Sequence, residues 1–470
     1  MLKNFSLFLF ILLATYSSVS AKEKYFKNIY EYGVYNSYLS QLKVFVEEQM
    51  SQSPHIKKAL EDKIAVAQNE FQKKGLAWIE SLQTVRFDSP ESLQLFHNKM
   101  ILGLRSLIQE KQRIGTTKDP LTDEISGFID NFCSWLFTIP NLNDEMEGFI
   151  KTVQDLSPQI TQEKSPHGIS GLFKEIYEKS LKDSRFDLDS EKGVLEDAHA
   201  DGDVTTLLFT LNNKAATKII RTPNAARDTS LNPITLKTGS AQVNEEFFNY
   251  LANQSKKGQK HLYINLMKRR SEEGIKTALI ETLEKDPRVE SALSIVTLDR
   301  NSDSAFYMQN GPFLEPFQAD EFKKNFLSEM FFEKGDYYWS HHLDKQFWKN
   351  YLVNLVEQIH CQYLGNKEQL SLQERKDFIE ITHVKIIETL IDHLQPNVVN
   401  MTCKHSIDRG PSLFSLFYFY EMHKAGQSNI MRTAAFFFAP SLLNHNRPAH
   451  APRVARFQSA ANLLLISNFE

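Results

Sequence analysis

Hydrophobic residues recur every three or four positions through the first third of the chain, a spacing typical of amphipathic helices. The clearest run contains Ile125, Phe128, Ile129, Phe132 and Leu136. The pattern is interrupted, at places suited to helix ends, by Pro120, Pro140, Pro158 and Pro166. We therefore expect an all-α N-terminal domain over residues 22–185.

The pattern changes after residue 182, where acidic side chains and two glycines replace the apolar spacing. The acidic residues are Asp187, Asp189, Glu191, Glu196, Asp197, Asp201 and Asp203. Such a composition suits a solvated connection between domains. We place an acidic linker at residues 186–203.

From residue 204 onward the pattern is mixed. Helical spacing at residues 245–254 and 271–285 separates short apolar or alternating runs that are typical of strands. The strand-like runs are residues 204–210, 260–266 and 293–298. Strands alternating with helices predict an α/β domain over residues 204–470, with a central sheet covered by flanking helices.

Within this domain, the segment around residues 313–394 has the pattern of a helical insertion. Its last helix, residues 381–394, is stopped by Pro396, which biases Gln395 away from the helical conformation. The β-prone run 398–402 follows, and Gly410-Pro411 opens a long apolar helix. The sequence therefore predicts a strand, a loop and a helix N-terminus around Cys403.

Residues 1–21 have the pattern of a secretory signal peptide. Lys3 precedes an apolar run from Leu7 to Ala14, and the small residues Val19-Ser20-Ala21 form a cleavage site. The run is too short to span a bilayer, and no later stretch of the sequence is long and apolar enough to do so. We therefore expect a secreted protein with a cleaved signal.

The composition is that of an ordinary globular protein, with 41% hydrophobic residues, 24% charged residues and a formal net charge of −4. Without a basic excess, nucleic acid is not an expected partner. Cys133, Cys361 and Cys403 are too few, and odd in number, for a disulfide scaffold. Cys133 and Cys361 fall in aromatic-rich helical patterns that predict core positions, and a bond between them stays open. Because Cys and His do not cluster at metal-ligand spacing, we expect neither a metal nor another cofactor.

The loop from Cys403 to Arg409 carries the most informative chemistry. Backbone N–H groups and a helix dipole at this position favour an anion. Together with the cation of Arg409, they lower the pKa of a Cys403 thiol. A thiolate in a phosphate cradle is a nucleophile for phosphate esters. An unreactive, half-buried thiol at a strand end is the alternative.

A resemblance to a known family rests on this loop, Cys403-Lys404-His405-Ser406-Ile407-Asp408-Arg409. It is similar to the Cys-x5-Arg signature of the cysteine-dependent phosphatase superfamily. Lys directly after Cys and Asp directly before Arg make it most like inositol-polyphosphate 4-phosphatases and the secreted phosphoinositide phosphatases that bacterial pathogens deliver into host cells. The similarity covers the loop and its flanks. It implies a cysteine-phosphatase-like α/β domain that works without a cofactor.

The resemblance also implies a role for each loop residue. Cys403 attacks phosphorus, Arg409 holds two phosphate oxygens with its planar fork, and Asp408 protonates the leaving oxygen. The substrate-binding remainder of the cradle is Lys404, His405, Ser406, Ile407 and Gly410. For Asp408, two structural roles stay open: bracing Arg409 or capping the helix.

Two positions depart from these relatives. The relatives carry Lys where this chain has Ile407, and this difference affects which lipid is recognised. The relatives carry Ser or Thr where this chain has Gly410, and this difference affects which hydroxyl helps the thiolate leave. Ser412 is a candidate substitute for that hydroxyl.

Two segments outside the loop are candidates for further contacts. The polar run Asp299-Arg300-Asn301-Ser302-Asp303 follows a predicted strand and is placed to supply an acid, although turn formation is the commoner role of such residues. Basic residues flank the strand at 260–266 and form either a solvated surface or a patch for lipid headgroups. They are Lys256, Lys257, Lys260, Lys268, Arg269 and Arg270.

These observations favour an exported phosphatase that hydrolyses phosphate monoesters of phosphoinositides or inositol phosphates through a phosphocysteine intermediate. One alternative is a protein tyrosine or dual-specificity phosphatase. The other is a catalytically inactive protein that binds a phosphorylated partner in the cradle. The resemblance implies a role inside a host cell, with peripheral membrane contact and a host protein bound by the N-terminal domain as further options.

Overall fold

The computed structural model describes residues 34–62, 67–84, 90–115, 119–138, 150, 168–182, 206–222, 224–231, 238–270, 273–301, 304–315, 317–404, 406–427, 429–441 and 449–466. The predicted signal peptide, the acidic linker and His405 lie outside these ranges. Among the helices within them, none is both long and apolar enough to span a membrane.

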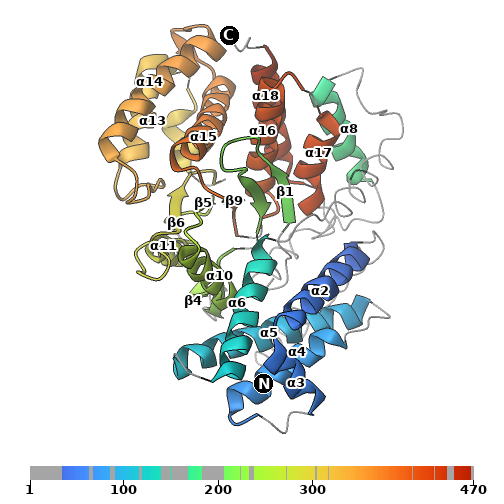
Figure 1. Ribbon diagram of the computed structural model, residues 1–470. Coiled ribbons are helices and arrows are strands. Elements are labelled where there is room, and N and C mark those ends of the chain that lie inside the picture. Colours follow the sequence, from blue (N-terminus) through green and yellow to red (C-terminus); the bar gives the residue numbers. More distant parts are fainter. Residues whose placement is uncertain are drawn as a thin grey trace, which may run out of the picture.

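The described part of the chain up to residue 138 is helical, as the periodicity predicts, and forms the lower half of the molecule in Figure 1. Helix α4 begins where the side chain of Asn69 accepts a hydrogen bond from the N–H of Gln72 at 2.9 Å. Apolar faces meet in the interior, where the rings of Trp78 and Phe132 pack edge to face with centroids 4.9 Å apart. The helices are α2 (Val34–Ser51), α3 (Pro54–Glu61), α4 (Glu70–Gln83), α5 (Pro90–Ile114) and α6 (Pro120–Thr138).

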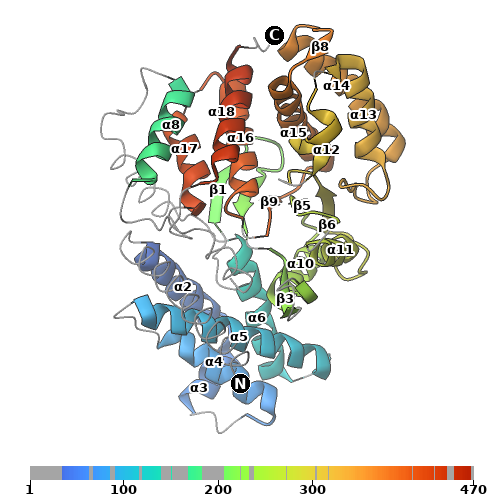
Figure 2. The ribbon, with the colours of Figure 1, turned by 180° about the vertical axis from the view of Figure 1, so that it is seen from behind.

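A mixed sheet with the strand order β1-β2-β9-β5-β6 occupies the centre of the molecule (Figures 1 and 2). Strands β2, β9, β5 and β6 are parallel, and β1 pairs antiparallel with β2. The bounds are β1 (Thr206–Thr210), β2 (Lys218–Arg221), β5 (His261–Asn265), β6 (Leu293–Thr297) and β9 (Val398–Thr402). The expected mixed α/β architecture is confirmed, and the three predicted strands correspond to β1, β5 and β6.

Strand β2 and the hairpin of β3 (Ala226–Leu231) and β4 (Thr238–Val243) are not among the strands expected from the sequence. β2 has only four residues, and β4 reads Thr-Gly-Ser-Ala-Gln-Val. Neither segment shows the alternation of apolar and polar residues that identifies a half-buried strand.

Alternate strand residues divide the core into two layers, because successive side chains of a strand point to opposite faces. Leu262 and Ile264 of β5 pack with the C-terminal helices. Tyr263 of the same strand packs with the N-terminal helices and with α10 (Glu245–Lys256) and α11 (Gly274–Leu283). The sheet is therefore covered on both faces.

The N-terminal helices share a core with the sheet through α10. The guanidinium of Arg105 donates to both carboxylate oxygens of Glu246, at 2.9 and 2.8 Å. The ring of Phe137 stacks on Tyr250 with centroids 5.1 Å apart. This part of the chain is consequently attached to the α/β part by a continuous buried interface.

The C-terminal layer contains the segment predicted as an insertion. Helix α15 begins at a capping box of Ser371 and Glu374, and its sides are largely buried. It packs against α16 and α18 in the main core, so residues 313–394 contribute a central helix to the C-terminal layer. The helices are α12 (Ala305–Met308), α13 (Ala319–Phe331), α14 (Lys345–Leu364), α15 (Leu372–Leu394), α16 (Arg409–Lys424), α17 (Ile430–Ala439) and α18 (Ala451–Ile466). The remaining strands, β7 (Phe317–Gln318) and β8 (Gln369–Leu370), pair antiparallel.

Helix α8 (Gly168–Ser180) lies within the sequence range predicted for the N-terminal domain but packs on the C-terminal layer. The ring of Phe173 stacks on Phe457 of α18, with centroids 4.4 Å apart and planes inclined by 8°. Helical periodicity identifies the apolar face of α8, but it does not say which surface covers that face.

Candidate functional site

Cys403 lies at the carboxyl edge of the sheet, directly after β9, which is flanked by parallel strands on both sides. The register pairs Asn265 of β5 with Thr402, and the N–H of Leu266 donates to the carbonyl of Thr402 at 2.8 Å. Residues that follow the other parallel strands therefore converge on the same edge. Helix α16 begins at Arg409, so the predicted order of strand, loop and helix is confirmed.

The loop between β9 and α16 is held in a tight conformation. Ser406 has a φ of 50°, in the left-handed region, and its side chain is fully buried. The guanidinium of Arg221, from the end of β2, donates from Nε to the carbonyl oxygen of Ser406 at 2.9 Å. A buried arginine from a neighbouring strand thus fixes the backbone of the loop.

Gly410 permits the close approach of α16 to β9. A Cβ at this position would lie 2.8 Å from the carbonyl oxygen of Met401 and 3.0 Å from Oγ of Ser406. The backbone therefore leaves no room here for the Ser or Thr side chain that the resembled family carries at this position. The hydroxyl of Ser412 accepts a hydrogen bond from Nη2 of Arg300 at 3.0 Å.

The thiol of Cys403 is buried, with 3% of the residue exposed. Burial alone would raise the pKa of the thiol. The charge of Arg409 and hydrogen bonds from the backbone N–H groups of Gly410 and Asp408 outweigh it, so the pKa of Cys403 lies below its ordinary value. The geometry therefore favours a thiolate.

Arg409 is held rigidly beside the thiol. Its Nη1 and Nη2 donate to the two carboxylate oxygens of Glu273, at 2.9 and 2.6 Å, and Nη1 also donates to Oδ1 of Asn301. Burial opposes the charge of Glu273, but Arg409 and the N–H of Lys268 hold the pKa of this carboxyl at about 2. The guanidinium is thus oriented before any ligand arrives.

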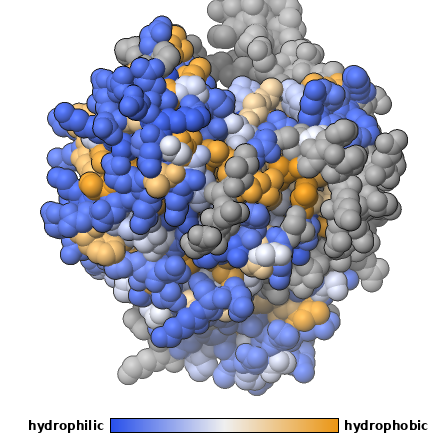
Figure 3. Space-filling model, turned by 90° about the horizontal axis from the view of Figure 1, so that it is seen from above, coloured by the Kyte–Doolittle hydropathy of each residue, from blue (hydrophilic) through white to orange (hydrophobic). Residues whose placement is uncertain are grey.

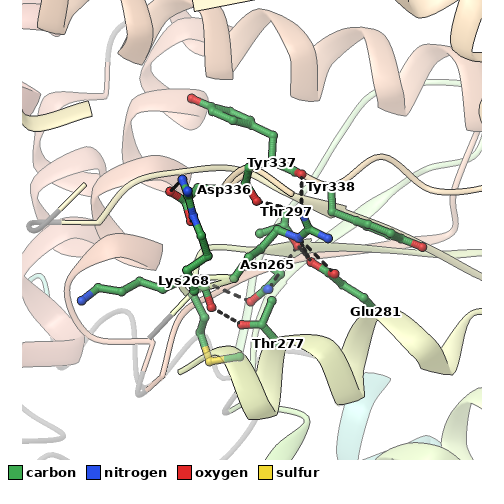
Figure 4. Close-up of polar contacts among 12 residues, drawn as sticks. Asn265, Lys268, Thr277, Glu281, Thr297, Asp336, Tyr337 and Tyr338 are labelled. Atoms are coloured by element: carbon green, nitrogen blue, oxygen red, sulfur yellow. Dashed lines mark hydrogen bonds and ion pairs between the residues drawn. The ribbon is translucent and has the colours of Figure 1, made fainter. Parts of the chain in front are cut away.

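The turn that carries Glu273 is itself anchored, since the N–H of Lys268 donates to Glu273 at 2.9 Å. Figure 4 shows the next contact, in which the carbonyl of Lys268 accepts from Oγ1 of Thr277 at 2.7 Å. Next along the turn, Arg269 donates from Nε to Glu281 at 3.0 Å and from Nη1 to the carbonyl of Tyr337 at 3.0 Å. These contacts connect the carboxylate behind Arg409 to β5, α11 and the segment before α14.

Asp408 precedes α16, and its side chain makes no capping hydrogen bond to that helix. Glu273 supplies a carboxylate that braces Arg409. The capping role considered for Asp408 is therefore not borne out, whereas its bracing and general-acid roles stay predictions.

The other predicted binding residues differ in exposure. Lys404 is half-buried and lies near Lys276, and burial together with the charge of Lys404 lowers the pKa of Lys276. Ile407 is 2% exposed. A contact between Ile407 and a bound anion would therefore come from its backbone N–H.

Asp299 is a second candidate for the acid, in the polar segment noted in the sequence. It is 1% exposed and follows β6 at the carboxyl edge of the sheet. Burial raises the pKa of its carboxyl to about 6, although hydrogen bonds from the Ser304 hydroxyl and the Asn301 amides favour the carboxylate. A carboxyl with this pKa is partly protonated near neutral pH and can act as a proton donor.

The predicted basic patch is divided by the structure. Lys256, Lys257 and Lys260 precede β5, whereas Lys268, Arg269 and Arg270 follow it, so the two groups lie at opposite ends of the strand. Arg270 is paired with Asp336 at 2.6 Å. These residues therefore do not form one continuous cationic surface.

The two other cysteines are free, as is Cys403. Cys133 is buried in the core, as predicted. Cys361 is exposed on α14, contrary to the prediction of a core position, because it is not on the buried face of that helix.

Sequence reasoning missed Glu273, Asn301 as a partner of Arg409, and Arg221. Each follows or ends a different parallel strand, and their position at strand ends is the signal that could have indicated them. Comparisons with protein-family models, with curated proteins and with solved structures found no match for this chain.

Proposed function

We propose that this protein is a cysteine-dependent phosphatase that hydrolyses phosphate monoesters of phosphoinositides or inositol phosphates. The observation that carries the proposal is the Cys403 thiol, which receives two backbone N–H groups and lies beside an Arg409 already oriented by Glu273 and Asn301. Nucleophile and phosphate-binding cation are thus present together at a helix N-terminus.

The reaction proceeds in two steps. The Cys403 thiolate attacks phosphorus, the bond to the ester oxygen breaks, and an acid delivers a proton to that oxygen. Water then attacks the phosphocysteine, which releases inorganic phosphate and regenerates the thiolate. Backbone N–H groups of the loop and the fork of Arg409 stabilise the charge on the phosphoryl oxygens in both steps.

Export from the producing cell belongs to the proposal and rests on the signal-like pattern of residues 1–21. The lipid class rests on Lys404 and Asp408, the two loop positions shared with the phosphoinositide phosphatases. A role inside a host cell follows from the same resemblance.

A protein tyrosine or dual-specificity phosphatase is the second candidate. Asp299 favours it, because a buried acid on a separate loop suits that class, whereas an acid within the cradle suits the lipid class. Retention of Cys403 and Arg409 in a preorganised arrangement argues against a protein that only binds phosphate.

The test is phosphate release from phosphoinositides, soluble inositol phosphates and phosphotyrosine peptides, with Cys403→Ser as the inactive control. We expect turnover of a phosphoinositide or inositol phosphate, reduced to below about one thousandth in the variant. Asp408→Asn and Asp299→Asn then identify the acid by the greater loss of kcat. A reduced, folded protein that releases phosphate from none of these substrates contradicts the proposal.

A further inference from the structure

Three buried arginines form a cluster behind the N-terminus of α16. Arg300 follows β6, and Arg453 and Arg456 lie on α18; we call these three residues the arginine cluster. They are 0%, 5% and 5% exposed. Figures 1 and 2 show that α15, α16 and α18 run side by side above the sheet. Arg300 contacts Glu380 of α15 and Ser412 of α16, which places the cluster among these helices.

Glu380 of α15 is the carboxylate at the centre of the cluster. Nη1 of Arg300 lies 2.5 Å from Oε2 of Glu380, and the hydroxyl of Tyr307 donates to Oε1 of the same side chain. Arg453 donates from Nη1 to the Tyr307 hydroxyl at 3.5 Å, and the guanidinium of Arg456 lies 4.3 Å from the Tyr307 ring centroid. The three arginines therefore share one carboxylate and one phenol.

The charges in the cluster do not balance. Within the described ranges, neither Arg453 nor Arg456 has an ion pair with a carboxylate, and Nη1 of Arg456 is buried without a hydrogen-bond partner. Asp377, one turn from Glu380, is instead bonded by Ser459 at 2.7 Å and Gln373 at 2.9 Å. Unpaired buried cations are costly in free energy, and a bound anion removes that cost.

The pKa shifts in the cluster bear on the same balance of charges. Burial would raise the pKa of Glu380, but Arg300 and Arg456 lower it overall, so its carboxylate is charged. Burial and the charges of Arg456, Arg300 and Arg409 lower the pKa of Arg453, although Tyr307 opposes the shift. Burial opposes the charge of Arg456, but Tyr307 and Glu380 raise its pKa overall. Glu380 therefore compensates Arg300 and Arg456, and Arg453 is the least compensated of the three arginines.

The cluster adjoins the Cys403 cradle. Arg300 directly precedes Asn301, which accepts a hydrogen bond from Arg409. Arg300 also donates to Ser412 in the first turn of α16, the helix that begins at Arg409. One contiguous set of contacts therefore joins the phosphate-binding arginine to the cluster.

We propose that the arginine cluster binds a second phosphate group of the substrate while the first is held by Cys403 and Arg409. The ligand is thus a small molecule or headgroup with at least two phosphates. Guanidinium groups bind phosphate oxygens in pairs, which suits Arg453 and Arg456. This inference rests on the proposed function for the identity of the first site, and its test is a binding measurement that does not require turnover.

Binding is measured by calorimetry on the Cys403→Ser protein with a soluble inositol bisphosphate and the matching monophosphate. We expect the bisphosphate to bind about 10–100-fold more tightly, which corresponds to one or two charge-assisted hydrogen bonds. Arg453→Gln and Arg456→Gln should each remove most of this ratio and leave monophosphate binding unchanged. Arg375→Gln is the matched control, because Arg375 is equally buried on α15 and its pKa is lowered by burial alone.

Two results would overturn the inference: equal affinities for the two ligands, or an affinity ratio that is unchanged by both substitutions. If a variant fails to fold, the comparison of the two ligands on the Cys403→Ser protein is still a test. A further outcome separates the two proposals. If the bisphosphate binds selectively but the protein that retains Cys403 shows no phosphatase activity, the second phosphate site is supported and the proposed function is contradicted. Phosphatidylcholine vesicles carrying a phosphatidylinositol bisphosphate form a second arm. Tighter binding to these vesicles than to the soluble ligand assigns the second phosphate to a lipid headgroup, and equal binding assigns it to the soluble compound.

Discussion

At the scale of single residues, the environment of a thiol decides whether it is reactive. Cys133 and Cys403 are both buried, and burial raises the pKa of each thiol. For Cys133 burial prevails and the pKa is raised. For Cys403 the adjacent Arg409 and two N–H groups reverse the direction. Reactivity therefore comes from the partners that the fold brings to the sulfur atom.

This contrast predicts the pH dependence of Cys403 alkylation by iodoacetamide. The thiolate reacts, so the rate should rise with pH to a midpoint below the ordinary cysteine value of about 8.5. Arg409→Met should move the midpoint upward, because burial then acts with less opposition. The measurement is peptide-resolved mass spectrometry, with exposed Cys361 as the internal reference. A midpoint at or above that of a free cysteine would refute a stabilised thiolate.

At the scale of elements, the site depends on how closely α16 approaches β9. The contact is made through Gly410, whose position leaves no space between the carbonyl of Met401 and the hydroxyl of Ser406. The left-handed Ser406 and the contact from Arg221 hold the other side of the loop. A change that moves α16 outward would therefore move Arg409 and the N–H groups away from Cys403.

Gly410→Ala should lower both stability and activity for this reason. We expect a loss of about 1–3 kcal/mol in the free energy of unfolding, typical of overpacking, and a fall in kcat larger than the change in KM. Urea unfolding and steady-state kinetics measure the two effects.

Gly127→Ala is the matched control for this substitution, because a Cβ at that position in α6 meets open space. It should stabilise the protein by about 0.5–1 kcal/mol. A Gly410→Ala protein as stable and active as the parent would show that the close approach is unnecessary.

At the scale of the whole molecule, the sheet joins two layers that the sequence presents separately. The N-terminal helices pack on α10 through the buried pair of Arg105 and Glu246, and α8 packs on the opposite layer. The face of the molecule seen in Figure 3 is largely hydrophilic, with apolar residues gathered near its middle. Large exposed apolar side chains of the described residues are spread over several elements and include Val44, Leu102, Ile275, Phe347 and Leu465.

Local signals in the sequence predicted the parts of the site that are continuous in the chain. A β-prone run, a cysteine and a Gly-Pro pair specify β9, the loop and α16 within a few residues. Glu273 and Asn301 were not anticipated as partners of Arg409, because they are more than 100 residues away and resemble ordinary turn residues. Their role depends on the parallel order of strands that bring both turns to one edge.

Long-range packing also limited the prediction of helices. The capping box at Ser371 and Glu374 starts α15 nine residues before the predicted helix at residue 381. Nothing in its periodicity shows that α15 lies between α14, α16 and α18 rather than at the surface. The periodicity of a helix shows which of its faces is buried, but it does not show which element packs against that face.

The most direct test of the account is to trap the phosphorylated enzyme. The protein is mixed with an aryl phosphate, quenched within the first turnover, digested and analysed by mass spectrometry. We predict a phosphate group on Cys403 that is lost with time and is missing in Cys403→Ser. Turnover without phosphate on this cysteine, or phosphate on another residue, would contradict the assignment of Cys403 as the nucleophile.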